Sequence, residues 1–142
     1  MATQTQPTIP DVIAVAEFRS ALRHFLRRSE KIARNSGLTP QRYTLLMMIK
    51  GAPEGDEQST VTELAEQMQL AQSTVTELVR RAESAGLIER EQSQRDARVT
   101  HLRLAPEGER RLMLSFTALE TERAQLREAF ANLDGGLTGT SR

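Results

Sequence analysis

The chain has 142 residues, enough for one domain with a hydrophobic core and little more. Its 19 basic and 19 acidic residues cancel, so bulk charge gives no support for nucleic-acid binding, and any such function must rest on local clusters. The lack of cysteine excludes disulfides, cysteine nucleophiles and thiolate metal sites, and the two histidines, His24 and His101, are too far apart in sequence to favour a zinc site.

Both ends of the sequence are polar. Residues 1–10 contain two prolines and predict a flexible arm. They lack the basic region and apolar run of a secretion signal, and no stretch of about 18 apolar residues occurs anywhere. Residues 134–142, DGGLTGTSR, predict a disordered tail. We therefore expect a soluble, cytoplasmic protein that does not bind a membrane. Residues 11–133 are expected to form one folded unit.

The residues from 11 to 36 predict a long first helix. Positions on one helical face recur at steps of three and four: Val15, Phe18, Leu22, Phe25, Ser29 and Ile32. A basic stripe follows the same helix: Arg19, Arg23, Arg27, Lys31 and Arg34. Like charges at this spacing each oppose a helix by about 0.2–0.5 kcal/mol. The stripe could face DNA phosphates, pair with acids of a dimer partner or receive an anionic ligand, but a solvated outer face is the simplest interpretation.

The middle of the chain begins with two predicted short helices. Thr39 precedes an apolar helix that starts with a proline and ends at Gly51. Thr60 and Glu63 have the spacing of a capping box, in which each residue satisfies a main-chain N–H of the other, and the helix TELAEQMQ follows.

A three-residue break, LAQ, separates this helix from another, STVTELVRRAESAG, which Gly86 ends. Two helices joined by so short a turn form a helix-turn-helix arrangement. The next segments, LIEREQ and RVTHLRL, predict two strands paired around residues 93–97. A hairpin directly after a helix-turn-helix describes a winged helix.

The second helix of this pair has one apolar and one polar face. The apolar face holds Val75, Leu78, Val79 and Ala82. The opposite face holds Ser73, Glu77, Arg80, Arg81 and Ser84, with Thr74 and Thr76 on its flanks. Hydroxyl groups form versatile hydrogen bonds, arginine contacts guanine through two bonds and glutamate accepts from cytosine N4. The pattern favours DNA contact in the major groove, although a solvated helix surface would also be polar.

The last helix is expected to begin at Pro106 and to run to residue 133, with Gly135 and Gly136 as its stop. Its repeat is Leu112, Phe116, Leu119, Arg123, Leu126, Phe130 and Leu133. Two long terminal helices have little central body to cover them in a short monomer, so we expect a homodimer joined through them. The alternative is that both helices pack within one chain.

The sequence resembles the MarR family of bacterial transcriptional regulators from about residue 37 to 112. The matching segments are GLTPQRYTLL, TVTELAEQMQLAQSTVTELVRRAESAGLIER, the Asp-x-Arg of Asp96 and Arg98, and LAPEG. The resemblance implies a mainly α (α+β) winged helix-turn-helix. Residues 11–36 and 106–133 would form dimerisation helices around a DNA-binding lobe of residues 37–105. A homodimer of this kind would bind pseudo-palindromic double-stranded DNA.

The resemblance also implies which residues meet DNA. The recognition helix would contribute Gln72, Ser73, Thr74, Thr76, Glu77, Arg80 and Arg81, and the wing Arg90, Arg95, Asp96 and Arg98. Arg98 corresponds to the minor-groove arginine of the family and Asp96 to the acid that orients it, while Arg95 is expected to touch phosphate. Ala71 and Ala105 depart from the family pattern, because each stands where a capping hydroxyl is common.

Relatives in the family often bind small aromatic or phenolic anions, which lower their affinity for DNA. By position, His24, Arg27 and Tyr43 are the candidates for such a site. The function expected from the resemblance is a sequence-specific repressor that a small ligand releases from DNA. The alternative is a winged-helix module that binds another protein. The sequence holds no nucleophile and base pair, metal cluster or phosphate loop, so we expect neither an enzyme nor a cofactor.

Overall fold

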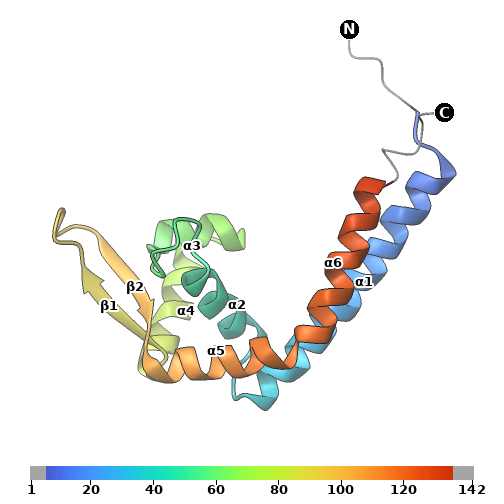
Figure 1. Cartoon of the computed structure of the whole chain (residues 1–142). Helices are drawn as coiled ribbons and strands as arrows, with labels where there is room; N and C mark the ends of the chain where they lie inside the picture. The colour runs from blue at the N-terminus through green and yellow to red at the C-terminus, as the bar shows by residue number, and fades with distance from the viewer. Residues whose placement is uncertain (1–5, 136–142) are drawn as a thin grey trace, which may run out of the picture. The chain divides into compact units, whose positions relative to one another are not determined.

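The computed structural model describes residues 6–135. Its elements in chain order are α1 (Ile9–Asn35), α2 (Pro40–Lys50), α3 (Val61–Met68), α4 (Gln72–Ser84), β1 (Ile88–Gln92), β2 (Thr100–Leu104), α5 (Pro106–Ala118) and α6 (Glu120–Gly135) (Figure 1). The described chain forms two compact units. The helical-pair unit comprises the residues up to 31 and from 118, and the central unit comprises residues 32–117. The mainly helical winged fold is the one the sequence predicts.

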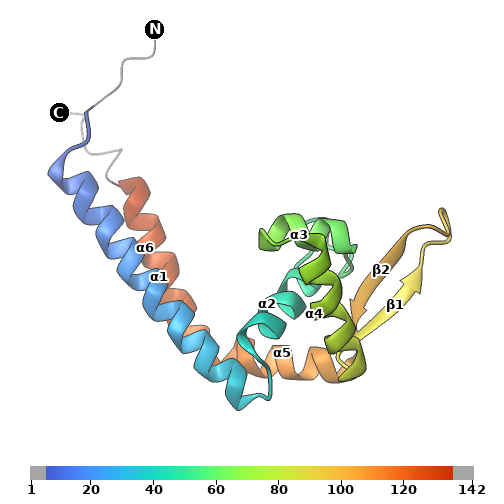
Figure 2. The same cartoon turned by 180° about the vertical axis from the view of Figure 1, so that it is seen from behind.

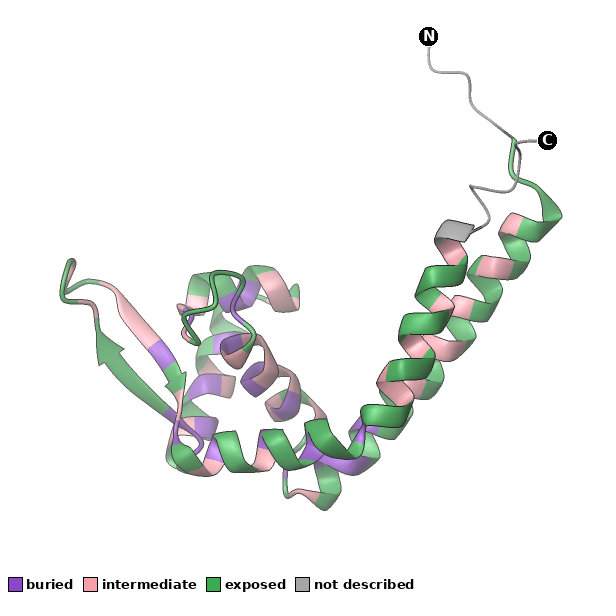
Figure 3. Cartoon of the chain, in the orientation of Figure 1, coloured by how far each residue is buried: buried purple, intermediate pink, exposed green. Residues whose placement is uncertain are grey.

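The central unit encloses the main hydrophobic core. Helices α2, α3 and α4 pack on one another, with the hairpin against α2 and α4. The purple, buried positions of Figure 3 include these fully covered side chains: Leu45, Leu46, Ile49, Leu64, Val75, Val79, Leu87, Leu102 and Leu112. These leucine, isoleucine and valine side chains come from helices and hairpin alike, so a common core fixes α4 and the hairpin together.

The hairpin is antiparallel and is held at its base by a third segment. Ile88 pairs with Leu104 and Gln92 with Thr100. Ser59, in the loop between α2 and α3, bridges to Leu102: its N–H donates to the Leu102 carbonyl at 3.1 Å, and the Leu102 N–H donates back at 2.8 Å. Main-chain hydrogen bonds therefore connect the base of the hairpin to the loop between α2 and α3.

Side-chain caps fix the starts of α2 and α3. The Arg42 N–H donates to Thr39 Oγ1 at 3.2 Å. Thr60 and Glu63 form the predicted capping box, with the Glu63 N–H donating to Thr60 Oγ1 at 3.2 Å and the Thr60 N–H to Glu63 Oε1 at 3.4 Å. Both caps confirm the predicted helix starts. Helix α4, in contrast, begins after Ala71 without a side-chain cap.

In the helical-pair unit, α1 and α6 lie side by side in both Figure 1 and Figure 2. The Phe18 and Phe130 rings meet edge to face with centroids 6.0 Å apart, and Arg28 Nε lies 3.3 Å from Glu122 Oε1. Several large apolar side chains of this unit stay exposed: Ile9, Val12, Ile13, Val15, Leu26 and Phe130. The two helices therefore pack within one chain yet leave apolar surface uncovered.

Three predicted boundaries were wrong. The segment 106–133 is two helices, interrupted at the buried Leu119, because a seven-residue repeat describes one helical face and carries no sign of a short break. Helix α1 begins at Ile9, inside the predicted arm, where Thr8 Oγ1 and Asp11 Oδ2 cap it. Helix α6 continues to Gly135, beyond the predicted start of the tail. The rest of the arm, 1–5, and of the tail, 136–142, lies outside the described residues.

No helix within residues 6–135 is long and apolar enough to cross a membrane.

Candidate nucleic-acid interface

Helix α4 presents a polar face, while its apolar face is turned into the core and is buried except at the half-buried Leu78. Val75, Val79 and Ala82 have no exposed surface. The first-turn side chains and the next polar position are exposed: Gln72, Ser73, Thr74 and Thr76. Only Gln72 of these four donates a side-chain hydrogen bond to another described residue, to Thr62 Oγ1 at 3.3 Å. Hydroxyl and amide groups in this position are free to bond to an outside partner.

A tight turn joins α3 to α4 and leaves the first residues of α4 exposed. Gln69 adopts a left-handed conformation with φ of 55°, and the Leu70 N–H donates to the Ala65 carbonyl at 3.0 Å. Ala65 is buried, so a small side chain stands where α3 and α4 meet. Because Ala71 supplies no side-chain cap, the first main-chain N–H groups of α4 carry no capping bond from that residue. The nearby hydroxyl of Ser73 forms no hydrogen bond within the described residues that would replace this cap.

Glu77 holds both arginines of α4. Arg80 Nη2 donates to Glu77 Oε1 at 2.7 Å and Arg80 Nε to Oε2 at 2.9 Å, while Arg81 Nε donates to Oε1 at 3.0 Å. These hydrogen bonds, first from Arg80 and then from Arg81, lower the pKa of Glu77 to about 2. The arginine side chains remain 61% and 62% exposed. The carboxylate is thus ionised at neutral pH and faces outward together with two guanidinium groups.

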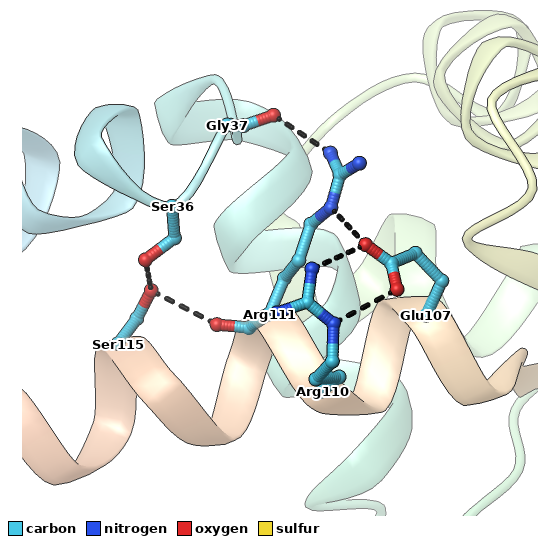
Figure 4. A network of polar contacts seen from close by, with 6 residues as sticks. All are labelled: Ser36, Gly37, Glu107, Arg110, Arg111 and Ser115. Atoms are coloured by element: carbon cyan, nitrogen blue, oxygen red, sulfur yellow. Dashed lines mark hydrogen bonds and ion pairs between the residues drawn. The ribbon is translucent and has the colours of Figure 1, made fainter.

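A second cluster with the same spacing lies on α5, where Figure 4 shows it in detail. Glu107 accepts from Arg110 at 2.6 and 2.9 Å and from Arg111 at 2.8 Å. Arg111 Nη1 also donates to the Gly37 carbonyl at 3.2 Å, in the loop before α2, so this cluster ties α5 to another part of the central unit.

Arg98 stands at the wing with its side chain 91% exposed. Its Nε lies 3.2 Å from Asp96 Oδ1 and its main-chain N–H donates to the same oxygen at 3.0 Å. The main-chain bond and then the side-chain bond lower the pKa of Asp96. Arg95 is exposed as well, and its N–H donates to Ser93 Oγ at 3.2 Å. Asp96 therefore restrains a guanidinium that projects from the turn.

Arg90 forms an ion pair that the sequence does not reveal. Its Nε donates to Glu83 Oε2 at 2.6 Å, which links β1 to the end of α4. The two residues are seven apart and belong to different kinds of element, so no local pattern indicates the contact. Arg90 thus connects the base of the wing to α4, and Glu83 joins the charged residues of this face.

Of the three predicted effector residues, His24 and Arg27 belong to the helical-pair unit and Tyr43 to the central unit. His24 and Arg27 line a hollow of about 490 Å³ on α1 with Arg23, Leu26 and Glu30. Tyr43 is buried in α2, within the central unit. The basic stripe of α1 is exposed along its length, and none of its five side chains lies within 4.0 Å of a carboxylate among residues 6–135. Two of the three candidates therefore share a surface with that stripe.

Comparison with known proteins identifies the family. A sequence model of a protein family, described as the MarR family, matches residues 36–99. The HTH-type transcriptional regulator YsmB of Bacillus subtilis, itself uncharacterized, is 30% identical over 122 residues, which cover 83% of this chain and 81% of YsmB. This chain belongs to the MarR family of transcriptional regulators. The family predicted from the GLIER segment, Asp96 and Arg98 is therefore confirmed.

Solved structures of the MarR family have the same fold. The MarR family transcription regulator SP03579 superposes with a TM-score of 0.69 at 22% identity, covering 89% of this chain and 87% of that one. A mutant of MarR from E. coli complexed with operator DNA superposes with a TM-score of 0.66 at 16% identity, covering 93% and 96%. The winged arrangement of α3, α4 and the hairpin is thus that of known MarR structures.

Proposed function

We propose that this MarR-family chain is a homodimeric, sequence-specific repressor that binds pseudo-palindromic double-stranded DNA in the cytoplasm and is released by a small aromatic or anionic ligand. The observation that carries the proposal is the wing arginine, Arg98, exposed over 91% of its side chain and restrained by Asp96. An exposed guanidinium held by an acid contributes little to stability, which leaves contact with a partner as its best explanation.

The wing fits a narrow minor groove. Negative potential is concentrated where an A·T-rich minor groove narrows, and arginine is the side chain that suits it. Asp96 limits the directions that the Arg98 side chain can take, which reduces the entropy lost when it enters the groove. We expect Arg95, which lies three residues earlier and is exposed, to contact a DNA phosphate beside the same groove.

The exposed face of α4 suits the major groove. Gln72, Ser73, Thr74 and Thr76 can donate to and accept from base edges, and Arg80 and Arg81 can reach guanine or phosphate. The uncapped start of α4 offers main-chain N–H groups to a phosphate. The operator complex of MarR from E. coli supports DNA as the partner of this fold.

A second copy of the chain is the proposed partner of the helical-pair unit. Ile9, Val12, Ile13 and Val15 are each at least half exposed on α1, and Phe130 is 60% exposed on α6. Burial of such side chains is the dominant favourable term in association. A two-fold dimer presents two recognition helices to half-sites about one helical turn apart, which explains a pseudo-palindromic operator.

The effector is proposed to bind near His24 and Arg27. Their hollow on α1 offers a cation and an imidazole beside Leu26, which suits a small aromatic anion. A ligand weakens DNA binding if it favours a spacing of the two recognition helices that differs from the spacing of the operator half-sites. Bound DNA then weakens ligand binding by the same free energy.

The experiment that tests the proposal selects duplexes from a random library and then measures their binding to Arg98→Ala. We expect an enriched pseudo-palindrome, and a loss in affinity of about 1–3 kcal/mol for the variant. The matched control is Arg110→Ala, which removes an arginine that is also paired with a glutamate but lies on α5. Size measurement in solution checks the dimer.

Two results would contradict this function. No enrichment together with no salt-dependent binding favours the alternative, a winged-helix module that binds another protein. Equal losses for Arg98→Ala and Arg110→Ala would show that only overall charge matters, and not the wing.

A further inference from the structure

The surface formed by residues 72–98, from the start of α4 to Arg98 at the turn of the wing, carries no net charge, although it contains five arginines. Between residues 72 and 98 the arginines are Arg80, Arg81, Arg90, Arg95 and Arg98. The same segment has five acids: Glu77, Glu83, Glu89, Glu91 and Asp96. A surface that binds a polyanion usually has an excess of positive charge. Here the balance is local to the proposed DNA contact and not only a property of the whole chain.

The arginines of this surface are also paired in space. Arg80 and Arg81 share Glu77, Arg90 contacts Glu83, and Arg98 contacts Asp96. Of the five arginines, Arg95 alone has no carboxylate within 4.0 Å among the described residues. Four of the five guanidinium groups therefore already have an anionic partner before any DNA arrives.

Such pairing matters most for binding without sequence preference. That binding comes from lysine and arginine neutralising phosphates and releasing counterions, so it grows with the number of free cations. An arginine bonded to a carboxylate must first leave it, and the carboxylate itself is repelled by phosphate. A paired surface therefore binds arbitrary DNA weakly and favours sequences that offer its acids a hydrogen-bond donor.

Glu77 differs from the other acids of the surface in its position and its contacts. Its two oxygens hold two arginines at once, and all three residues lie on the exposed side of α4. Glu83 joins α4 to β1, and Asp96 shapes the turn of the wing through a main-chain bond, so both also serve the fold. Within the described chain, the hydrogen bonds of Glu77 all stay on α4.

We propose that Glu77 is a specificity-determining residue. On DNA of arbitrary sequence it keeps its hydrogen bonds with Arg80 and Arg81, so these arginines do not bind phosphates. Where a cytosine amino group donates to the Glu77 carboxylate instead, the two arginines are free to bind DNA. This inference rests on the proposed function of DNA binding. Cytosine N4 is the major-groove donor that glutamate accepts from, and the guanine paired with it offers two acceptors to an arginine. The expected operator half-site therefore contains a C·G pair facing Glu77.

The competing explanation is a helix-stabilising pair. Glutamate followed by arginine three and four residues later stabilises any exposed helix slightly. The α5 cluster of Glu107, Arg110 and Arg111 has this same spacing and is the natural control, because it lies outside the proposed DNA surface. Glu107→Gln removes the same charge and the same kind of pair as Glu77→Gln.

The experiment compares full-length wild-type protein, Glu77→Gln and Glu107→Gln on two duplexes, a random sequence and the operator selected by the wild type. For Glu77→Gln we expect binding to the random duplex to tighten about fivefold to tenfold at ~0.1 M salt for each subunit that contacts the duplex, because about one more phosphate is neutralised per subunit. The salt slope steepens by about 0.9 per subunit. The ratio of operator to random affinity falls, and selection with this variant loses the preference at one C·G pair.

The outcomes separate the two hypotheses. Equal behaviour of Glu77→Gln and Glu107→Gln would overturn the inference while leaving the proposed function intact. Loss of operator and random binding together in Glu77→Gln would also overturn it, because the carboxylate would then position the arginines instead of withholding them. Absence of DNA binding by the wild type would refute the proposed function itself. Thermal melting of both variants verifies that each is folded.

Discussion

The two glutamate-arginine clusters of the central unit are locally alike and differ in their surroundings. On α4, Glu77 holds Arg80 and Arg81, and on α5, Glu107 holds Arg110 and Arg111 at the same spacing. The α5 cluster continues into the fold through the bond from Arg111 to the Gly37 carbonyl, whereas the described contacts of the α4 cluster end within its own helix. The local sequence pattern thus determines which ion pairs form. Tertiary contacts determine whether such a cluster also stabilises the fold, as on α5, or is available to bind a partner, as on α4.

The largest expected effect concerns the close contact that anchors the α5 cluster. Gly108 follows Glu107, and a Cβ at this position would overlap the Leu87 carbonyl oxygen and lie 3.0 Å from the Leu87 carbonyl carbon. That oxygen also accepts the Ala105 N–H at 2.9 Å, so the main chain cannot simply withdraw. We expect Gly108→Ala to lower the free energy of unfolding by about 3 kcal/mol, measured by urea denaturation.

The control for Gly108→Ala is Thr117→Ala, at an exposed position of the same helix, which should stay within about 0.5 kcal/mol of the wild type. If Gly108→Ala were as stable as the control, α5 would not be fixed against Leu87. The anchoring that distinguishes the α5 cluster would then be smaller than the geometry indicates.

The next effect compares equivalent arginines of the two clusters. Arg111→Ala removes a bond to a main-chain carbonyl from a side chain that is only 30% exposed, so we expect a loss of about 1 kcal/mol in unfolding free energy. Arg81→Ala removes one surface pair from a side chain 62% exposed, and should change stability by less than about 0.5 kcal/mol.

DNA binding should show the reverse order for these two variants. Titration of the selected operator is expected to find weaker binding for Arg81→Ala and unchanged binding for Arg111→Ala. Equal losses of stability in both variants would remove the distinction between a structural and an open cluster.

The elements with strong local patterns were the predictable ones. The caps at Thr39 and Thr60 and the hairpin around residues 93–97 follow from short segments, because a cap or a tight turn is a contact between near neighbours. The contact between Asp96 and Arg98 is of the same kind, since the two residues are two apart and share one turn.

The features that the sequence does not reveal depend on distant partners. The ion pair of Arg90 with Glu83 joins a strand to a helix, and the bond of Arg111 to Gly37 spans 74 positions. The break at Leu119 escapes detection because its leucine repeat continues unchanged on both sides. The sequence around Gly108 gives no sign of its tertiary contact, and only the approach of the Leu87 main chain shows why a larger side chain does not fit.

The smallest effect tests whether the two clusters are equivalent before any partner binds. Hydrogen bonds from Arg80 and then Arg81 lower the pKa of Glu77 from 4.5 to about 2, and those from Arg110 and then Arg111 lower the pKa of Glu107 to the same value. A carboxyl whose pKa is lower in the folded state stabilises the fold above its unfolded pKa and ceases to do so as the pH falls towards 2.

Carboxyl-carbon NMR titration of the free protein should therefore give midpoints near pH 2 for both residues. Arg80→Ala should raise the pKa of Glu77 more than Arg81→Ala does, because Arg80 donates two hydrogen bonds to Glu77 and Arg81 donates one. A pKa of Glu77 well above that of Glu107 would mean that the open cluster is looser in solution than the anchored one. Glu77 would then restrain its arginines less, and the expected gain of Glu77→Gln on random DNA would shrink accordingly.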